Sequence, residues 1–184
     1  MNRKSPKISC IILAGGEGKR VAGQDKGLVL YKNKPLVEHV IATVKNQCND
    51  IIISANRNIK YYNKYTNKVV TDLSENYRGP LAGIAACLPH CDHELVLVVA
   101  CDMPELPVNL VERLTSDINN HSICIAAVDN HHQLAMVINR SLLASIQHSL
   151  DNNQLKLITW VASVSHKTVS FDDIPDAFIN LNKL

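Results

Sequence analysis

The chain has 184 residues, of which 46% are hydrophobic and 20% are charged, as expected for one globular domain with a substantial core. Its formal net charge is only +2 at pH 7, which gives no reason to expect nucleic acid or a membrane surface as a partner. The longest apolar run, 95–101, is far shorter than the roughly 18 residues that suggest a membrane span, so we expect a single domain over residues 1–184 without a membrane segment.

Short apolar runs alternate with helical patterns along the whole chain, which predicts an α/β fold with a parallel sheet covered by helices. The predicted strands cover residues 8–13, 51–55, 68–71, 94–101, 123–128, 134–138, 166–171 and 178–181. The predicted helices cover residues 35–46, 58–67, 81–88, 107–118, 140–150 and 155–164. The strand at 94–101 is the most apolar and should be central. The helix at 58–67 is polar and tyrosine-rich, and we expect Tyr61, Tyr62 and Tyr65 to lie on a solvated helix rather than to stack on bases.

A glycine-rich stretch follows the first predicted strand. It contains Gly15, Gly16 and Gly18, and then the cations Arg20 and Lys26. Glycine lets backbone N–H groups approach phosphate oxygens closely because it has no Cβ, and the two cations add positive charge. The stretch therefore predicts a site for a triphosphate.

The neighbours of Lys26 have more local expected roles. Asp25 should orient Lys26 or cap a turn, and Gly27 should relieve backbone strain. Two familiar phosphate motifs do not fit this stretch. Val21 stands where a dinucleotide fingerprint needs its third glycine, and Arg20 stands where a Walker A loop needs a hydroxyl.

Three chemically distinctive features follow predicted strands. They are the Gly15-Gly16 turn, Asp72 and Asp102. Ligands of open α/β sheets bind beyond the carboxyl ends of the strands, so we expect these features to converge. Asp102 is the predicted Mg²⁺ ligand, because magnesium prefers carboxylate oxygens and keeps several waters. The alternatives are a helix-capping role for Asp102, which Pro104 and Pro107 disfavour, and an ordinary turn role for Asp72.

The six cysteines, at positions 10, 48, 87, 91, 101 and 124, form no C-x-x-C pair. Cys10, Cys101 and Cys124 lie inside apolar runs, where cysteine behaves as a small hydrophobic residue. Residues 1–7 are polar and basic, and no cleavage site follows them. These features favour reduced thiols in a cytoplasmic protein over a disulfide framework or a zinc site.

Several motifs together resemble the molybdenum cofactor guanylyltransferase family. They are Leu13-Ala14-Gly15-Gly16, Arg20, Gly23-x-Asp25-Lys26-Gly27, Lys34-Pro35-Leu36, and the segments 79–84, 101–104 and 178–182. The resemblance covers nearly the whole chain, although cytidylyltransferases and sugar-phosphate nucleotidyltransferases share the first motif in weaker form. It implies a three-layer Rossmann-like nucleotidyltransferase fold with a mostly parallel central sheet.

The resemblance also implies a set of site residues. The implied catalytic residues are Lys26, Asp102 and Arg20, with Asp102 as the Mg²⁺ ligand. The implied nucleotide-binding residues are Leu13, Ala14, Gly15, Gly16, Lys26, Ser54, Asp72 and Asp102. The implied acceptor-binding residues are Gly79, Pro80, Leu81, Gly83, Asn180 and Asn182.

The activity implied by the resemblance is transfer of GMP from GTP to the phosphate of molybdenum-molybdopterin, with release of pyrophosphate. Molybdoenzymes or their chaperones would then be partners. The acceptor phosphate is largely ionised at neutral pH, so the reaction needs no general base. The alternatives are a nucleotidyltransferase for another phosphorylated acceptor, using CTP or a sugar phosphate, and a nucleotide-binding adaptor without catalysis. The glycine at position 15 favours GTP, because cytidylyl relatives tend to have alanine there.

Some positions depart from the family pattern. Ser54 stands where the family commonly has an asparagine, Gln133-Leu134 stands near a common His-Pro pair, and 154–156 replaces an arginine-containing stretch. His131 and His132 lie near these positions, where we expect a solvated turn at 129–132.

Overall fold

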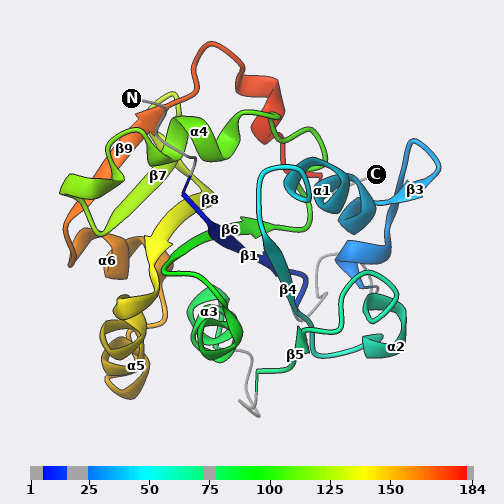
Figure 1. Ribbon diagram of the computed structural model, residues 1–184, viewed down its shortest axis with the longest axis horizontal. Helices are drawn as coiled ribbons and strands as arrows, with labels where there is room; N and C mark the ends of the chain where they lie inside the picture. The colour runs from blue at the N-terminus through cyan, green and yellow to red at the C-terminus, as the bar shows by residue number, and fades with distance from the viewer. Residues whose placement is uncertain (1–5, 16–24, 73–77, 182–184) are drawn as a thin grey trace.

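A seven-stranded sheet forms the centre of the molecule, in the order β5-β4-β1-β6-β8-β7-β9 (Figure 1). The computed structural model describes residues 6–15, 25–72 and 78–181. The strands are β1 (Ile8–Leu13), β4 (Asp50–Ser54), β5 (Val69–Val70), β6 (Leu95–Ala100), β7 (Ile123–Val128), β8 (His131–Asn139) and β9 (His166–Ser170). Strand β8 runs antiparallel to β6 and β7, whereas the other neighbouring pairs of this sheet are parallel. The prediction of a mostly parallel sheet with β6 at its centre is confirmed.

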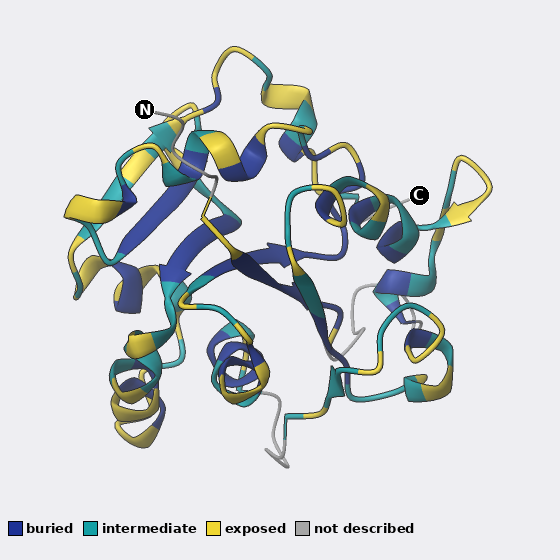
Figure 2. Ribbon diagram, viewed as in Figure 1, coloured by how far each residue is buried: buried dark blue, intermediate teal, exposed yellow. Residues whose placement is uncertain are grey.

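Helices cover both faces of the sheet, which confirms the three-layer arrangement (Figure 1). One face packs against α1 (Leu36–Val44), α2 (Ile59–Tyr62) and α4 (Leu110–Thr115). The other face packs against α3 (Pro80–Cys87), α5 (Leu143–Asp151) and α6 (Leu157–Ala162). Figure 2 shows the central strands as the most deeply buried part of the chain.

Strand β1 illustrates why these runs are apolar throughout. Its residues Ile8, Cys10 and Ile12 face the first helical layer, and Ile11 and Leu13 face the second. All of these side chains are buried, because a parallel strand between two helical layers has no solvent-facing side. A continuous apolar run is therefore the pattern of a central strand here. Among the described residues, no helix is both long and apolar enough to cross a bilayer.

Three predicted elements differ from the structure. No strand forms at 178–181; a 3-10 turn (Pro175–Phe178) precedes an irregular segment, and Phe178 is buried against Phe171 with ring centroids 4.9 Å apart. One of the apolar residues that suggested a strand, Phe178, therefore anchors a loop, whereas Ile179 is 53% exposed. The turn before β8 is also shorter than predicted, since only Asp129 and Asn130 have positive φ and His131 already belongs to the strand. A small hairpin of β2 (Leu30–Tyr31) and β3 (Lys34–Pro35) was not predicted.

The third predicted element that differs is the helix at 58–67, since the β2–β3 hairpin was not among the predicted elements. Helix α2 spans only Ile59–Tyr62, and Tyr62 is completely buried rather than solvated. Tyr61 and Tyr65 are half-buried, and both hydroxyls donate to Glu38 of α1. Two carboxylates thus hold the tyrosine hydroxyls. Glu38 accepts from Tyr61 and Tyr65, and Asp25 accepts from Tyr62. Because the residues between Tyr62 and Tyr65 are polar, the sequence pattern gave no indication of this packing.

Candidate active site

The carboxyl ends of four parallel strands meet at one edge of the sheet. Backbone hydrogen bonds join these ends: Ala14 N–H donates to the Ser54 carbonyl (2.9 Å), and Cys101 N–H donates to the Leu13 carbonyl (3.1 Å). Gly15 thus follows β1 beside the end of β4, and Asp102 follows β6 beside the end of β1. The predicted convergence is confirmed for Gly15 and Asp102, whereas Gly16 lies outside the described residues.

Asp102 is a buried carboxylate at this edge, with only 4% of its surface exposed. Its Oδ2 forms an ion pair with Lys26 Nζ, whereas its Oδ1 has no hydrogen-bond partner among the described residues. The alternative role as a helix cap is wrong, because the next helix, α4, begins at Leu110 with Asn109 as its N-cap. A buried carboxylate with one unpartnered oxygen is costly to maintain, which points to a ligand.

Lys26 connects Asp102 to the end of the chain. It begins a 3-10 helix (Lys26–Leu28), and its ammonium group donates to Asn180 Oδ1 at 3.1 Å as well as to Asp102. The Leu181 N–H in turn donates to the backbone carbonyl of Asp102 at 3.1 Å. Two predicted catalytic residues and one predicted acceptor-binding residue therefore lie together, although they are far apart in sequence.

The carboxylate of Asp102 has the chemistry to hold a hard divalent cation such as Mg²⁺. Within the described ranges, no three His, Cys, Asp or Glu side chains gather to hold a metal. A single carboxylate with a free oxygen suits Mg²⁺, which takes its remaining ligands from waters and substrate phosphates. The neighbouring Cys101 does not compete as a nucleophile, because burial, followed by the charge of Asp102, raises the pKa of its thiol well above the usual range.

A second polar pair lies beyond β4 and β5. Asn56 Nδ2 donates to Asp72 Oδ1 (3.0 Å), and the Asp72 N–H donates to Asn56 Oδ1 (3.1 Å). Asn56 also lies beside Gly15, since a Cβ on Gly15 would lie 3.8 Å from the Asn56 Nδ2 atom. The sequence interpretation had not chosen Asn56 as a site residue. Its place two residues after the end of β4 was the available indication.

Ser54 and Gly83 have a structural role in this arrangement. Ser54 is only 2% exposed, and a Cβ on Gly83 would lie 2.7 Å from its Oγ and 3.1 Å from Leu13 Cδ2. The close approach of α3 to β1 and β4 therefore requires a glycine at position 83 and a small residue at position 54. Both residues, predicted as ligand contacts, belong to this helix–sheet contact.

The remaining predicted site residues differ in how far their side chains are exposed. Leu81 is completely buried in the core under α3, so its side chain is closed to a ligand. Gly79 is exposed with a φ of 76°, and Pro80 occupies the first position of α3. Leu13 and Ala14 are each 8% exposed, which leaves mainly their backbone for nucleotide contacts. Gly16, Arg20 and Asn182 lie outside the described residues.

The neighbours of Lys26 behave partly as predicted. Asp25 caps the 3-10 helix, because its Oδ1 accepts from the Gly27 N–H at 3.1 Å. The predicted relief of strain by Gly27 is wrong, since Gly27 does not adopt a left-handed φ. Instead, a Cβ at this position would lie 2.5 Å from the Tyr62 hydroxyl, so close packing requires the glycine.

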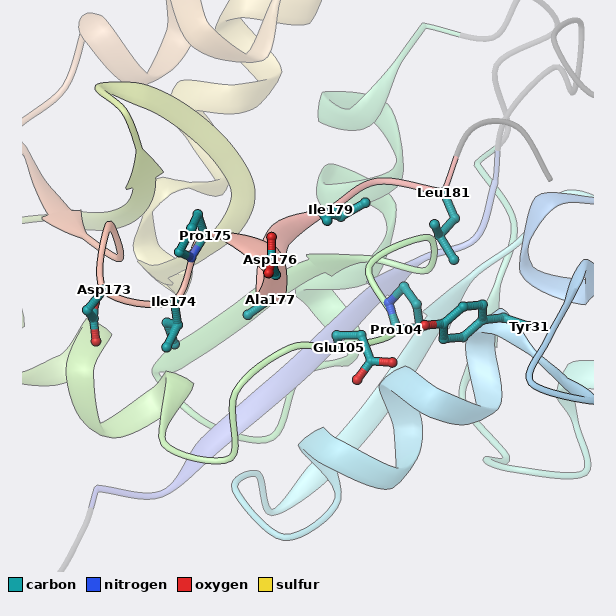
Figure 3. A pocket seen from close by; sticks show the side chains of 10 residues that line it. All are labelled: Tyr31, Pro104, Glu105, Asp173, Ile174, Pro175, Asp176, Ala177, Ile179 and Leu181. Atoms are coloured by element: carbon teal, nitrogen blue, oxygen red, sulfur yellow. The ribbon is translucent and has the colours of Figure 1, made fainter.

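A groove of about 710 Å³ opens beside the Asp102 segment (Figure 3). Pro104 and Glu105 form one side of the groove, and residues 173–177 with Ile179 and Leu181 form another. Tyr31 from the β2–β3 hairpin closes its end. Leu181, which lines the groove, donates its N–H to the backbone carbonyl of Asp102, so the groove lies next to the segment that carries the buried carboxylate.

Comparison with known proteins agrees with this geometry. Residues 10–167 match the family model described as the MobA-like NTP transferase domain. The chain is 39% identical over 178 residues to the molybdenum cofactor guanylyltransferase of Photobacterium profundum, covering 96% of this chain and 91% of that one. It is 36% identical over 179 residues to the protein of the same name from Shewanella halifaxensis, covering 96% and 90%.

Solved structures agree on the fold. The molybdopterin-guanine dinucleotide biosynthesis protein A of Archaeoglobus fulgidus superposes with a TM-score of 0.78 at 20% identity, covering 95% of this chain and 92% of that one. Because the family model matches residues 10–167 and the named relatives align over 96% of the chain, the protein is an enzyme that belongs to the MobA-like NTP transferase family.

Proposed function

We propose that this protein transfers GMP from GTP to the terminal phosphate of molybdenum-molybdopterin, giving the guanine dinucleotide form of the cofactor and pyrophosphate. The observation that carries the proposal is the buried Asp102, which pairs with Lys26 through one oxygen and leaves the other without a partner. At such a position a metal ion would bind the unpartnered carboxylate oxygen, and the phosphates would supply further oxygen ligands to that metal.

The proposed nucleotide site spans the edge of the sheet from Asp102 to Asp72. The backbone at Ala14 and Gly15 faces this edge, where no Cβ at Gly15 hinders a close approach. The Asn56–Asp72 pair offers both an amide and a carboxylate for a nucleoside. The names of the close relatives, which are guanylyltransferases, support GTP over CTP.

The acceptor would approach from the side of Asn180. The groove of Figure 3 supports this direction, because it begins next to Asp102 and combines apolar side chains with carboxylates. Such a lining suits a flat heterocycle with N–H donors, as in a pterin. The acceptor phosphate would then lie near Lys26 and Asn180, whose side chains are joined by a hydrogen bond from Lys26 Nζ to Asn180 Oδ1.

Catalysis in this proposal depends on alignment and charge neutralisation. Lys26 would hold phosphate oxygens with its ammonium group while Asn180 keeps that group at the boundary of the two substrates. Mg²⁺ on Asp102 would neutralise negative charge on the triphosphate. The acceptor phosphate monoester has a second pKa of about 6 and attacks as an anion, so no side chain has to remove a proton.

The test is an assay of pyrophosphate release with purified protein, molybdenum-molybdopterin and Mg²⁺. We expect product formation with GTP and much less with CTP or UTP. Rapid reaction with CTP, or with a sugar phosphate in place of molybdopterin, would replace this function by that of another nucleotidyltransferase. Tight GTP binding without any pyrophosphate would favour the non-catalytic adaptor.

A further inference from the structure

Asp25 carries a network of hydrogen bonds next to the reacting centre. It is only 8% exposed, and its carboxylate accepts from three donors. The Gly27 N–H and the Tyr62 hydroxyl donate to Oδ1 at 3.1 and 2.6 Å, and Asn58 Nδ2 donates to Oδ2 at 2.9 Å. Both carboxylate oxygens are thus held in place.

Two of these donors come from a different part of the chain. Asn58 and Tyr62 belong to the α2 segment, which follows β4 along the chain (Figure 1). Tyr62 is completely buried, so its ring cannot move away from Asp25 without opening the core. Gly27 fits against its hydroxyl, at a distance that leaves no space for a methyl group.

Lys26 lies between the two residues that this network immobilises. The Asp25 side chain is fixed by α2, and the Gly27 backbone is fixed by Asp25 and by the shape of Tyr62. From this held backbone, the Lys26 side chain extends to Asp102 and Asn180. Pre-orientation of a long side chain lowers the entropy lost when it contacts a ligand.

We propose that Tyr62 and Asn58 are positioning residues that act through Asp25 to aim Lys26 at the reacting phosphates. The importance of this Lys26 orientation for catalysis rests on the function proposed above. The orientation itself is a property of the protein without substrate. Burial, and then the hydrogen bond to Asp25, raises the pKa of Tyr62 far above its usual range, so its hydroxyl remains a donor at working pH.

Tyr65 provides a matched control. Its hydroxyl also donates to a carboxylate, that of Glu38, and burial together with this bond raises its pKa as well. Tyr65 lies three residues after Tyr62, and its hydroxyl donates to Glu38 and Tyr61 rather than to Asp25. The substitutions Tyr62→Phe and Tyr65→Phe therefore remove the same chemical group from neighbouring sites, and only the first should affect Lys26.

The first experiment measures the reactivity of Lys26 without any substrate. The full chain is treated with limiting acetyl N-hydroxysuccinimide ester, and the acetylation rate of each lysine is followed by mass spectrometry. We expect Lys26 to react several-fold faster in Tyr62→Phe and at the wild-type rate in Tyr65→Phe. Equal Lys26 rates in wild type and Tyr62→Phe would overturn the proposal, as would an equal increase in both variants.

Gly27→Ala by itself keeps the proposal falsifiable if Tyr62→Phe is unstable, because an unchanged Lys26 acetylation rate in that single variant would contradict the network. In wild type, Gly27→Ala places a methyl group against the Tyr62 hydroxyl and should also speed acetylation of Lys26. In a Tyr62→Phe background the same methyl meets only ring carbons at 3.4 and 3.5 Å, which is ordinary contact. The effect of Gly27→Ala should therefore shrink in that background, and additive effects would contradict the network.

Kinetics then connect the network to catalysis. We expect Tyr62→Phe to lower kcat/KM for GTP about tenfold, less than the 10²-fold loss that a misplacement of about 1 Å can cause. Tyr65→Phe should change it less than about twofold, within the range of a remote surface substitution. If wild type neither binds nor turns over GTP, the proposed function fails, but the acetylation result still decides whether α2 aims Lys26.

Discussion

Two lysine–aspartate pairs of this protein have similar chemistry but different surroundings. Lys26 and Asp102 meet at the carboxyl end of β6, where the side chains are 27% and 6% exposed. Lys167 and Asp117 meet beside β9 at the other end of the sheet, where both side chains are 42% exposed. The first pair is mostly removed from water, and the second remains solvated.

The difference separates a site from a surface contact. A solvated pair contributes little to stability, because water screens the charges and both side chains lose mobility. A buried carboxylate loses its hydration, and the unpartnered Oδ1 of Asp102 has no compensation within the described residues. Stability alone therefore gives no reason for the first pair, whereas chemistry on a phosphate does.

The largest expected effect is on Asp102. Asp102→Asn keeps the side-chain volume and removes the negative charge. We expect kcat to fall on the order of 10³-fold, because the carboxylate that would hold the metal is lost. Pyrophosphate release measures the rate, and the thermal unfolding midpoint checks that the variant folds. A folded variant with activity within tenfold of wild type would remove Asp102 from the reaction.

The next effect is on Lys26. Lys26→Ala should lower kcat/KM for GTP about 10²-fold, through both a higher KM and a lower kcat, because the ammonium group contacts the phosphates before and during transfer. Lys167→Ala is the matched control in the solvated pair and should leave both parameters unchanged. Similar kinetics for the two variants would erase the contrast between the two pairs.

A smaller effect concerns stability at the contact between α3 and the sheet. Gly83→Ala should lower the free energy of unfolding by about 1–2 kcal/mol, because overpacking at Ser54 outweighs the gain of about 1 kcal/mol in helix propensity. In a Ser54→Ala background the penalty should shrink toward zero. Urea denaturation of the four proteins of this cycle measures the coupling. An unchanged stability accompanied by a raised acceptor KM would instead return Gly83 to the binding site.

The smallest effect is on the solvated pair itself. The hydrogen bond from Lys167, and then its charge, lowers the pKa of Asp117 from its ordinary value of 3.8. A lowered pKa in the folded state stabilises the protein above the unfolded value, and this contribution disappears as the pH falls through the folded value. Asp117→Asn should therefore unfold at a slightly lower temperature than wild type near pH 7, and the difference should vanish in acid. Thermal unfolding at several pH values measures it, and a difference that grows in acid would contradict the sign.

Much of the fold was predictable from local patterns. The runs at 8–13 and 94–101 are apolar because both faces of a central parallel strand are covered, so their continuity alone identified them. The glycines after the first run and Asp102 after the second then indicated the edge of the sheet that binds ligands. The prediction of a strand at 178–181 was wrong, because Phe178 anchors a loop against Phe171 instead.

The sequence by itself determined most of the order of strands and helices and singled out Lys26 and Asp102 as candidate phosphate- and metal-binding residues, since each prediction depends on neighbours within a few positions. The tertiary structure alone decided which distant groups meet. It joined Lys26 to Asp102 and Asn180, assigned Gly83 and Ser54 to packing, and placed Tyr62 of α2 against Asp25. These contacts depend on strand order and on how closely layers approach, and residue spacing along one chain contains no measure of either.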